Sequence, residues 1–202
     1  MKIALIGAGG TAGSRILEEL IRRGHDVLAL ARTPSKVAAS RRVPVRQLDA
    51  SNAALVAQSV RGQDAVVSAT NFTQTNTQNL IDGITTAGVR RFVVVGGAGS
   101  LETAPGVREM DDPRFPIAVK TEAEAGSRFL DQLRASELDW TFLSPSRLFA
   151  PGVRTGKFRV GKDQLIVDHA GRSAISMEDY AIALVDELER PAHVCARFTV
   201  GY

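Results

Sequence analysis

A glycine-rich stretch near the start of the chain has the spacing of a phosphate-binding loop. Glycine occupies positions 7, 10 and 13, with a further glycine at 9, in the run 7–13 GAGGTAG. The run follows an apolar segment of strand length and opens a segment with helical periodicity, which is the context that such a loop requires. Gly7 permits a tight turn, Gly10 lets the backbone approach a pyrophosphate, and Gly13 lets the helix pack closely on the strand.

The backbone of this stretch supplies the chemistry of anion binding. We expect the N–H groups of residues 10–13 and the positive end of the helix dipole to hold phosphate groups. The alternative interpretation is a tight strand-to-helix turn without a ligand. The residues predicted to bind a dinucleotide here are Gly7, Gly9, Gly10, Thr11, Ala12 and Gly13.

The residue that ends the next apolar run favours NADP(H) over NAD(H). An NAD site usually has an Asp or Glu about 20 residues beyond the glycines, bonded to the ribose hydroxyls. Here Arg32 stands 19 residues after Gly13. A guanidinium can bind a 2′-phosphate with two hydrogen bonds, and Lys36 adds positive charge. Thr33 is predicted as a neighbouring contact, and the alternative for Arg32 is a solvated side chain at a helix N-terminus.

Further cofactor contacts are predicted where the next two apolar runs end. Asp49 is expected to accept a hydrogen bond from the adenine amino group, to cap the following helix, or to do both. Its neighbour Ala50 is also predicted to bind the cofactor. Ala69 and Thr70 follow the fourth run, where fold geometry places them beside the cofactor.

Short apolar runs alternate with helix-period segments through the first half. Strands are predicted at 3–6, 27–31, 43–48, 65–69 and 92–95, and helices at 11–23, 33–39, 51–60 and 79–87. This alternation predicts an α/β chain with a parallel sheet and helices on both faces, a Rossmann-like doubly wound fold.

The second half is less regular. Residues 96–116 show no period, 117–134 is a predicted helix with Val119, Ala123, Leu130 and Leu133 inward, and 140–144 is a strand. A hairpin of 158–160 with 164–167, a helix capped by Ser176 and ending at residue 189, and a strand at 198–200 complete the prediction. We expect one domain over 1–202, with a nucleotide-binding core at 1–145 and a small acceptor-side extension at 146–202.

Composition excludes several classes of protein. The chain has 44% apolar and 23% charged residues, which excludes a disordered protein, a collagen and a coiled coil. No apolar run reaches the roughly 18 residues of a membrane span, and the N-terminal apolar run is too short for a signal peptide. The single cysteine, Cys195, cannot form an internal disulfide, which favours the cytoplasm. Three separated histidines give no metal-binding pattern.

The net charge of +3 is unevenly distributed, with +6 on residues 1–101 and −3 on residues 102–202. The basic half indicates an anionic ligand. Short basic runs and 5% aromatics argue against nucleic acid. The predicted partner is a small-molecule acceptor, and the chain is expected to be a monomer or a homodimer.

Several stretches together resemble the atypical short-chain dehydrogenase/reductases. Within these the chain is similar to the group named NADH-flavin reductases or NAD(P)H-binding proteins. The stretches that carry the resemblance span nearly the whole chain and are 7–13 GAGGTAG, 32–34 RTP, 66–69 VVSA, 93–100 VVVGGAGS, 138–141 LDWT, 144–145 SP, 175–181 ISMEDYA and 198–202 FTVGY. The resemblance implies a nucleotide-binding fold, and Pro145 is counted with the cofactor-binding residues.

The catalytic pattern of the wider superfamily, Tyr-x-x-x-Lys with an upstream serine, is incomplete in this chain. Lys120 stands at the expected place, but Pro116 replaces the tyrosine, and Gly97 falls at the serine position with Ser100 as a stand-in. Lys120 is predicted to bind the nicotinamide ribose and Ser100 to orient an acceptor. The alternatives are a helix-surface lysine and a structural loop serine. Glu122 and Glu124 are predicted to form a solvated helix face.

Three functions are consistent with these residues. Without the tyrosine acid, the chemistry favours an NAD(P)H-dependent oxidoreductase that passes hydride to a flavin (FMN or FAD), a quinone or a similar conjugated ring, since solvent can protonate the product. The alternative is a non-catalytic NADP(H)-binding sensor. Nucleoside-sugar epimerase or dehydratase activity is less favoured because of Pro116 and the short C-terminal half.

Overall fold

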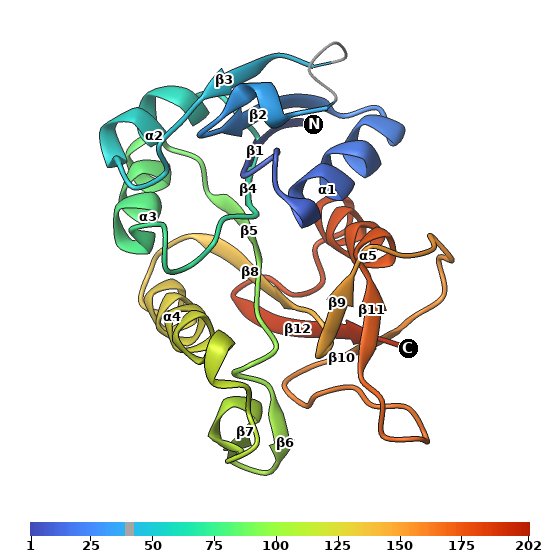
Figure 1. Cartoon of the computed structure of the whole chain (residues 1–202). Coiled ribbons are helices and arrows are strands. Elements are labelled where there is room, and N and C mark those ends of the chain that lie inside the picture. The colour runs from blue at the N-terminus through green and yellow to red at the C-terminus, as the bar shows by residue number, and fades with distance from the viewer. Residues whose placement is uncertain (39–42) are drawn as a thin grey trace.

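The computed structural model, which describes residues 1–38 and 43–202, is built on an eight-stranded β-sheet (Figure 1). The strand order is β10-β12-β8-β5-β4-β1-β2-β3, and every neighbouring pair is parallel except β10 with β12. Their bounds are β1 Lys2–Ile6, β2 Asp26–Ala31, β3 Val45–Gln47, β4 Ala65–Ser68, β5 Arg91–Val95, β8 Asp139–Ser144, β10 Arg159–Gly161 and β12 Ala196–Gly201.

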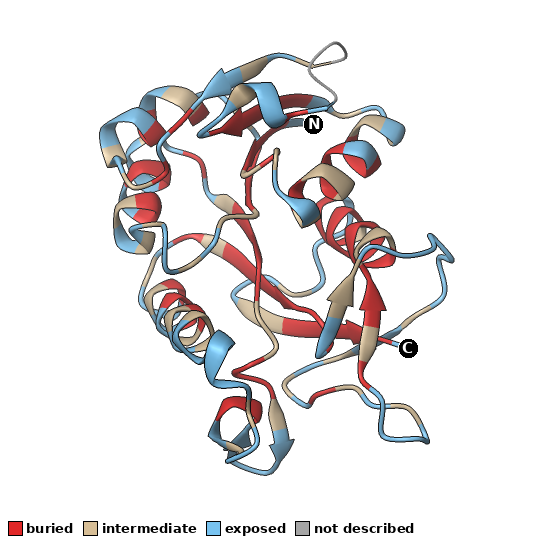
Figure 2. Cartoon of the chain, viewed as in Figure 1, coloured by how far each residue is buried: buried red, intermediate tan, exposed pale blue. Residues whose placement is uncertain are grey.

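Helices cover both faces of this sheet. Helices α1 (Thr11–Arg22) and α5 (Met177–Glu189) pack on one face, and α2 (Ala53–Val60), α3 (Thr77–Thr86) and α4 (Ile117–Arg134) pack on the other (Figure 1). Alternate strand residues serve the two faces because successive side chains of a strand point to opposite sides. Ile3 and Leu5 join the cluster with α1, and Ala4 and Ile6 join the cluster with α3. Figure 2 shows the buried strands between these layers.

The predicted Rossmann-like doubly wound fold is therefore confirmed. The chain order reverses between β1 and β4, and ligands of such sheets bind at the carboxyl ends of the strands beside this point. The glycine-rich stretch follows β1, and residues 69–70 follow β4, so the topology brings them together.

The predicted hairpin of 158–160 with 164–167 is wrong. Residues 159–161 form β10, which pairs antiparallel with β12, with Val160 opposite Val200. Gln164 instead forms an isolated bridge with Glu102. The pairing places β10 at the border of the main sheet, next to the C-terminal strand β12.

The stretch 96–116 contains short structure despite its lack of period. Strands β6 (Glu102–Ala104) and β7 (Val107–Arg108) form a small hairpin, followed by a 3₁₀ turn at Glu109–Asp111. Arg147 binds Glu109 through two hydrogen bonds of 2.6 and 2.8 Å, which fixes this segment to the chain after β8. Strands β9 (Leu148–Ala150) and β11 (Ala174–Ser176) pair beside the main sheet.

Local details differ from the predictions in three places. The short helix after Thr33 is a 3₁₀ turn at Pro34–Lys36, and its predicted end at residue 39 lies outside the described residues. Asn52 caps α2 by accepting from the Leu55 N–H, where Asp49 was predicted. Val119 is 49% exposed instead of inward, because the buried face of α4 begins further along, at Gly126 and Phe129.

Within the described part of the chain, no helix combines the length and the apolar character needed to cross a membrane.

Candidate functional site

A cavity of about 320 Å³ opens at the carboxyl ends of β1, β2 and β4. It brings together residues that lie far apart in the sequence. The predicted cofactor-binding residues that line it are Gly7, Gly9, Gly10, Arg32, Thr33, Lys36, Asp49, Ala50, Ala69 and Thr70.

The glycines shape one wall of this cavity. Gly7 has a φ of +87°, and a Cβ at that position would collide with the Ala69 carbonyl oxygen. A Cβ on Gly13 would collide with the Gly7 carbonyl oxygen, so α1 packs directly against the end of β1. These two positions therefore require glycine, one for its turn and one for close approach.

The backbone hydrogen bonds of the loop decide which N–H groups remain for a ligand. The Gly7 and Ala8 N–H groups donate to the Leu30 carbonyl oxygen at 2.8 and 3.2 Å. The Gly10 N–H was predicted to donate a hydrogen bond to a phosphate. It donates instead to the Gly7 carbonyl oxygen at 3.0 Å, which corrects that expectation. The first-turn N–H groups of residues 11–13 have no intrahelical partner, and the N-cap Gly10 has no side chain to supply one.

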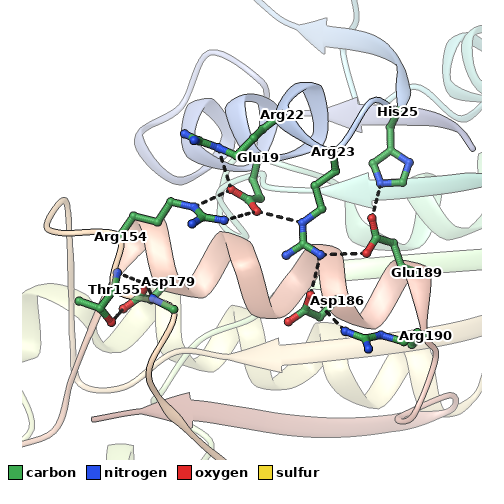
Figure 3. Close-up of polar contacts among 11 residues, drawn as sticks. Glu19, Arg22, Arg23, His25, Arg154, Thr155, Asp179, Asp186, Glu189 and Arg190 are labelled. Carbon is green, nitrogen blue, oxygen red and sulfur yellow. Dashed lines mark hydrogen bonds and ion pairs between the residues drawn. The ribbon is translucent and has the colours of Figure 1, made fainter.

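The far end of α1 is tied to the rest of the molecule by ion pairs, as Figure 3 shows. Buried Glu19 accepts hydrogen bonds from Arg23 at 2.9 Å and from Arg154 at 2.8 and 3.0 Å. Burial alone raises the pKa of Glu19, but Arg154 and Arg23 outweigh it, so its pKa lies below the usual value. Arg23 also pairs with Asp186 of α5 at 2.7 Å. The helix that carries the phosphate loop is therefore fixed at its C-terminal end.

Positively charged residues also line the cavity. Arg32 follows β2, and its Nη2 donates to the Gln74 side-chain oxygen at 2.7 Å. Lys36 lies next to Gly9, where an added Cβ would be 3.3 Å from the Lys36 Cβ. Asp49 also lines the cavity, and its Oδ1 accepts from the Ser51 N–H at 2.9 Å. Guanidinium and ammonium groups beside a helix N-terminus fit a phosphorylated ligand.

The sequence predictions missed part of the lining. The missed residues are Ile6, Ala31, Leu48, Asn71, Gln74 and Thr75. Ile6 and Ala31 end strands and Leu48 directly follows β3, so these three could have been found from the rule that carboxyl ends of strands face the ligand. The polar run after Thr70 could have been found in the same way.

Six predicted residues do not lie on the cavity wall. Lys120 is exposed in the first turn of α4, and Pro145 is buried after β8. Ser100 is 8% exposed, and its hydroxyl oxygen accepts a hydrogen bond from Arg197 at 3.0 Å. Thr11, Ala12 and Gly13 stand beside the cavity at the start of α1 without lining it.

Glu122 corrects the expectation of a solvated face on α4. Its two carboxylate oxygens accept the N–H groups of Phe72 at 2.6 Å and Thr73 at 3.0 Å. Glu124 is exposed as predicted.

The two tyrosines of the chain take structural positions. Tyr180 is fully buried, and its hydroxyl donates to the Leu143 carbonyl oxygen at 2.5 Å. Burial raises its pKa well above the ordinary value. The Tyr202 hydroxyl is bonded to Ser176 and Asp179, both at 2.8 Å. Among the described residues, no group of three His, Cys, Asp or Glu could hold a metal ion.

Comparison with known proteins finds relatives that align over nearly the whole chain. The uncharacterized protein YwnB of Bacillus subtilis (strain 168) is 42% identical over 211 residues, which cover 99% of this chain and 98% of YwnB. The structure of a protein of Bacteroides thetaiotaomicron proposed to be an epimerase has a TM-score of 0.95 at 46% identity, covering 100% of this chain and 96% of that one. A protein of Streptococcus pneumoniae TIGR4, proposed to be an NADH-flavin reductase, has a TM-score of 0.87 at 36% identity, covering 100% and 99%.

The family match agrees with the cavity. The sequence model described as NAD(P)H-binding matches residues 7–191, which include the glycine loop, Arg32 and the residues after β4. The chain therefore belongs to the NAD(P)H-binding family.

Proposed function

We propose that this chain is an NADPH-dependent oxidoreductase that reduces a flavin, a quinone or a similar conjugated ring. The observation that carries the proposal is that Arg32 and Lys36 line the same cavity as the glycine loop. The similarity to the Streptococcus pneumoniae protein supports a reductase. When bound, NADPH supplies a hydride to the acceptor ring, and solvent supplies the proton that completes the reduction.

In this proposal, the residues of the chain bind and orient the cofactor, and the proton comes from solvent. The first-turn N–H groups of α1 would hold the pyrophosphate, and Arg32 and Lys36 the 2′-phosphate. Lys120 would bind the nicotinamide ribose. Neither tyrosine can act as the acid of carbonyl reduction, because Tyr180 is buried and Tyr202 is bonded at the C-terminus. A conjugated acceptor needs no such acid, so this chemistry suits the site.

The cofactor preference is tested by Arg32→Ala. Loss of the guanidinium removes hydrogen bonds to the 2′-phosphate, which NADH lacks. We expect the Kd for NADPH to rise about 10- to 100-fold, the size of one or two charge-assisted hydrogen bonds, and the Kd for NADH to change less than about threefold. Calorimetric titration of both nucleotides measures these values.

The matched control is Arg61→Ala, an exposed arginine after α2 that does not line the cavity. It should leave both Kd values unchanged. Equal losses for NADPH and NADH in Arg32→Ala would contradict the 2′-phosphate assignment. No turnover of NADPH with FMN, riboflavin or quinones would contradict the reductase.

A non-catalytic NADP(H) sensor is the second candidate, favoured by the engagement of the Ser100 hydroxyl with Arg197. Steady NADPH oxidation that Lys120→Ala slows would exclude it. Binding of NADPH without oxidation by any of these acceptors would favour it.

A further inference from the structure

The segment of residues 70–76, here named the 70–76 loop, joins β4 to α3 and lies between the cavity and α4. On one side Thr70, Asn71, Gln74 and Thr75 line the cavity. On the other side the loop is attached to α4 through Phe72 and Thr73. It therefore connects the helix that carries Lys120 with the nucleotide site.

The attachment to α4 uses the backbone of the loop. One oxygen of Glu122 accepts the Phe72 N–H at 2.6 Å, and the other accepts the Thr73 N–H at 3.0 Å. Hydrogen bonds to an ionised carboxylate are stronger than those between neutral groups. Two adjacent N–H groups held by one carboxylate fix both the position and the direction of the loop.

A second contact lies one helical turn further along the same face of α4. A Cβ on Gly126 would lie 2.8 Å from the Phe72 ring, so the ring fills the space that this glycine leaves. The ring centroid is 6.0 Å from that of Phe129 and 6.3 Å from that of Phe142. Backbone and side chain of the loop are thus both docked on α4.

On its cavity side, the loop contacts Arg32 through Gln74. The Gln74 side-chain oxygen accepts from Arg32 Nη2 at 2.7 Å, and the Gln74 N–H donates to Asn71 Oδ1 at 3.2 Å. An arginine has five N–H donors, so this bond leaves others for a phosphate. Arg32 and Gln74 are both exposed, so this hydrogen bond is a contact through which the loop can orient the Arg32 guanidinium.

We propose that Glu122 is a positioning residue for cofactor selectivity, which acts by fixing the 70–76 loop so that Gln74 holds Arg32 ready for the 2′-phosphate. The inference rests on the proposed preference for NADPH. Glu122 does not itself line the cofactor cavity. A preorganised arginine loses less side-chain entropy on binding, and this gain applies only to a ligand with a 2′-phosphate.

The test is Glu122→Gln, which keeps the size of the side chain but leaves one acceptor oxygen for two N–H groups. We expect the Kd for NADPH to rise about tenfold and the Kd for NADH about twofold, so the ratio of the two affinities falls about fivefold. A role in stability alone would shift both Kd values together, so this ratio is the decisive readout. Glu124→Gln, two residues along the same helix and exposed, is the control and should leave both Kd values unchanged.

A second variant keeps the test decisive if Glu122→Gln lowers the folded fraction. Gln74→Ala leaves the attachment to α4 intact and should reproduce the loss of the affinity ratio. An unchanged ratio in folded Glu122→Gln, or in Gln74→Ala, in a wild-type protein that prefers NADPH, overturns this inference alone. A wild-type protein with no preference for NADPH contradicts the proposed cofactor and this inference together.

Discussion

Tyr180 of α5 lies in the core against β8, with no exposed surface. Its ring centroid is 4.7 Å from that of Phe149, and its hydroxyl shares the Leu143 carbonyl oxygen with the Gly96 N–H at 2.8 Å. A tyrosine in an oxidoreductase is a natural candidate for a proton donor. Tyr180 instead has a structural role, because it is buried and its hydroxyl donates a hydrogen bond to a backbone carbonyl oxygen.

Tyr180→Phe separates these two roles. Leu143 keeps the Gly96 N–H as a partner, so we expect a loss of only about 0.5–1.5 kcal/mol of stability. That corresponds to a fall in Tm of roughly 1–6 °C, with NADPH oxidation within about twofold of wild type. Thermal unfolding and steady-state assays measure the two quantities. A variant that folds normally but has lost nearly all activity would restore Tyr180 as an acid.

At the scale of elements, the N-terminus of α5 organises the chain around residues 152–157. The buried Asp179 carboxylate accepts the Thr155 N–H at 2.7 Å, the Gly156 N–H at 2.8 Å and the Thr155 hydroxyl at 2.5 Å (Figure 3). Its neighbour Glu178 accepts from the Gly152 N–H at 2.7 Å and from Arg15 at 3.2 Å. The acids at the start of α5 therefore anchor a loop and contact α1.

Asp179→Asn tests this anchor through its pH dependence. Burial raises the pKa of Asp179, but the hydrogen bonds from Thr155, Gly156 and Tyr202 outweigh it, and the pKa lies below 3.8. A carboxyl with a lowered folded pKa adds stability above its unfolded pKa of about 3.9, and this is lost as pH falls through the folded value. We expect the variant to lose about 1–3 kcal/mol at pH 7 and less near pH 3.

Urea unfolding at both pH values measures the effect. Asp131→Asn is a matched control, because Asp131 forms an exposed i,i+3 pair with Arg134, which is worth less than about 1 kcal/mol. An equal loss for Asp179→Asn at pH 7 and pH 3 would show that its charge is not the source of the stability.

The helices, strands and loops also show how far the structure can be predicted from the sequence. The central strands of the parallel sheet were predictable because they are short apolar runs buried on both faces. The glycine loop was predictable because its spacing is local. The pairing of β10 with β12 was not, since about 40 residues separate the partners and a nearer partner fitted the pattern. Glu122 and Gln74 were missed for the same reason, because their partners lie 50 and 42 residues away.

Across the whole molecule, charge is divided between the two halves of the chain. Residues 1–101 carry a formal charge of +6 and include the positive lining of the cavity, while residues 102–202 carry −3. Lys120 comes from the acidic half, so the asymmetry does not extend to every predicted cofactor contact. A phosphorylated ligand is attracted toward the basic half, and salt weakens this attraction because the Debye length falls from about 10 Å at 0.1 M to 3 Å at 1 M.

We therefore expect the affinity for NADPH to fall more steeply with NaCl than the affinity for NADH. The additional 2′-phosphate charge is the reason, and titrations between 50 and 300 mM NaCl measure both slopes. In Arg32→Ala the two slopes should converge. Parallel slopes in the wild-type protein would argue that the 2′-phosphate lies away from these cations.

The two borders of the main sheet, β3 and β10, are each three residues long. Exposed strand borders are where separate chains add to one another, and the number of backbone hydrogen bonds available limits how strongly they do so. Neither border gives a second chain more than a few such bonds. Pairing of two copies through either border of the main sheet would therefore gain few backbone hydrogen bonds.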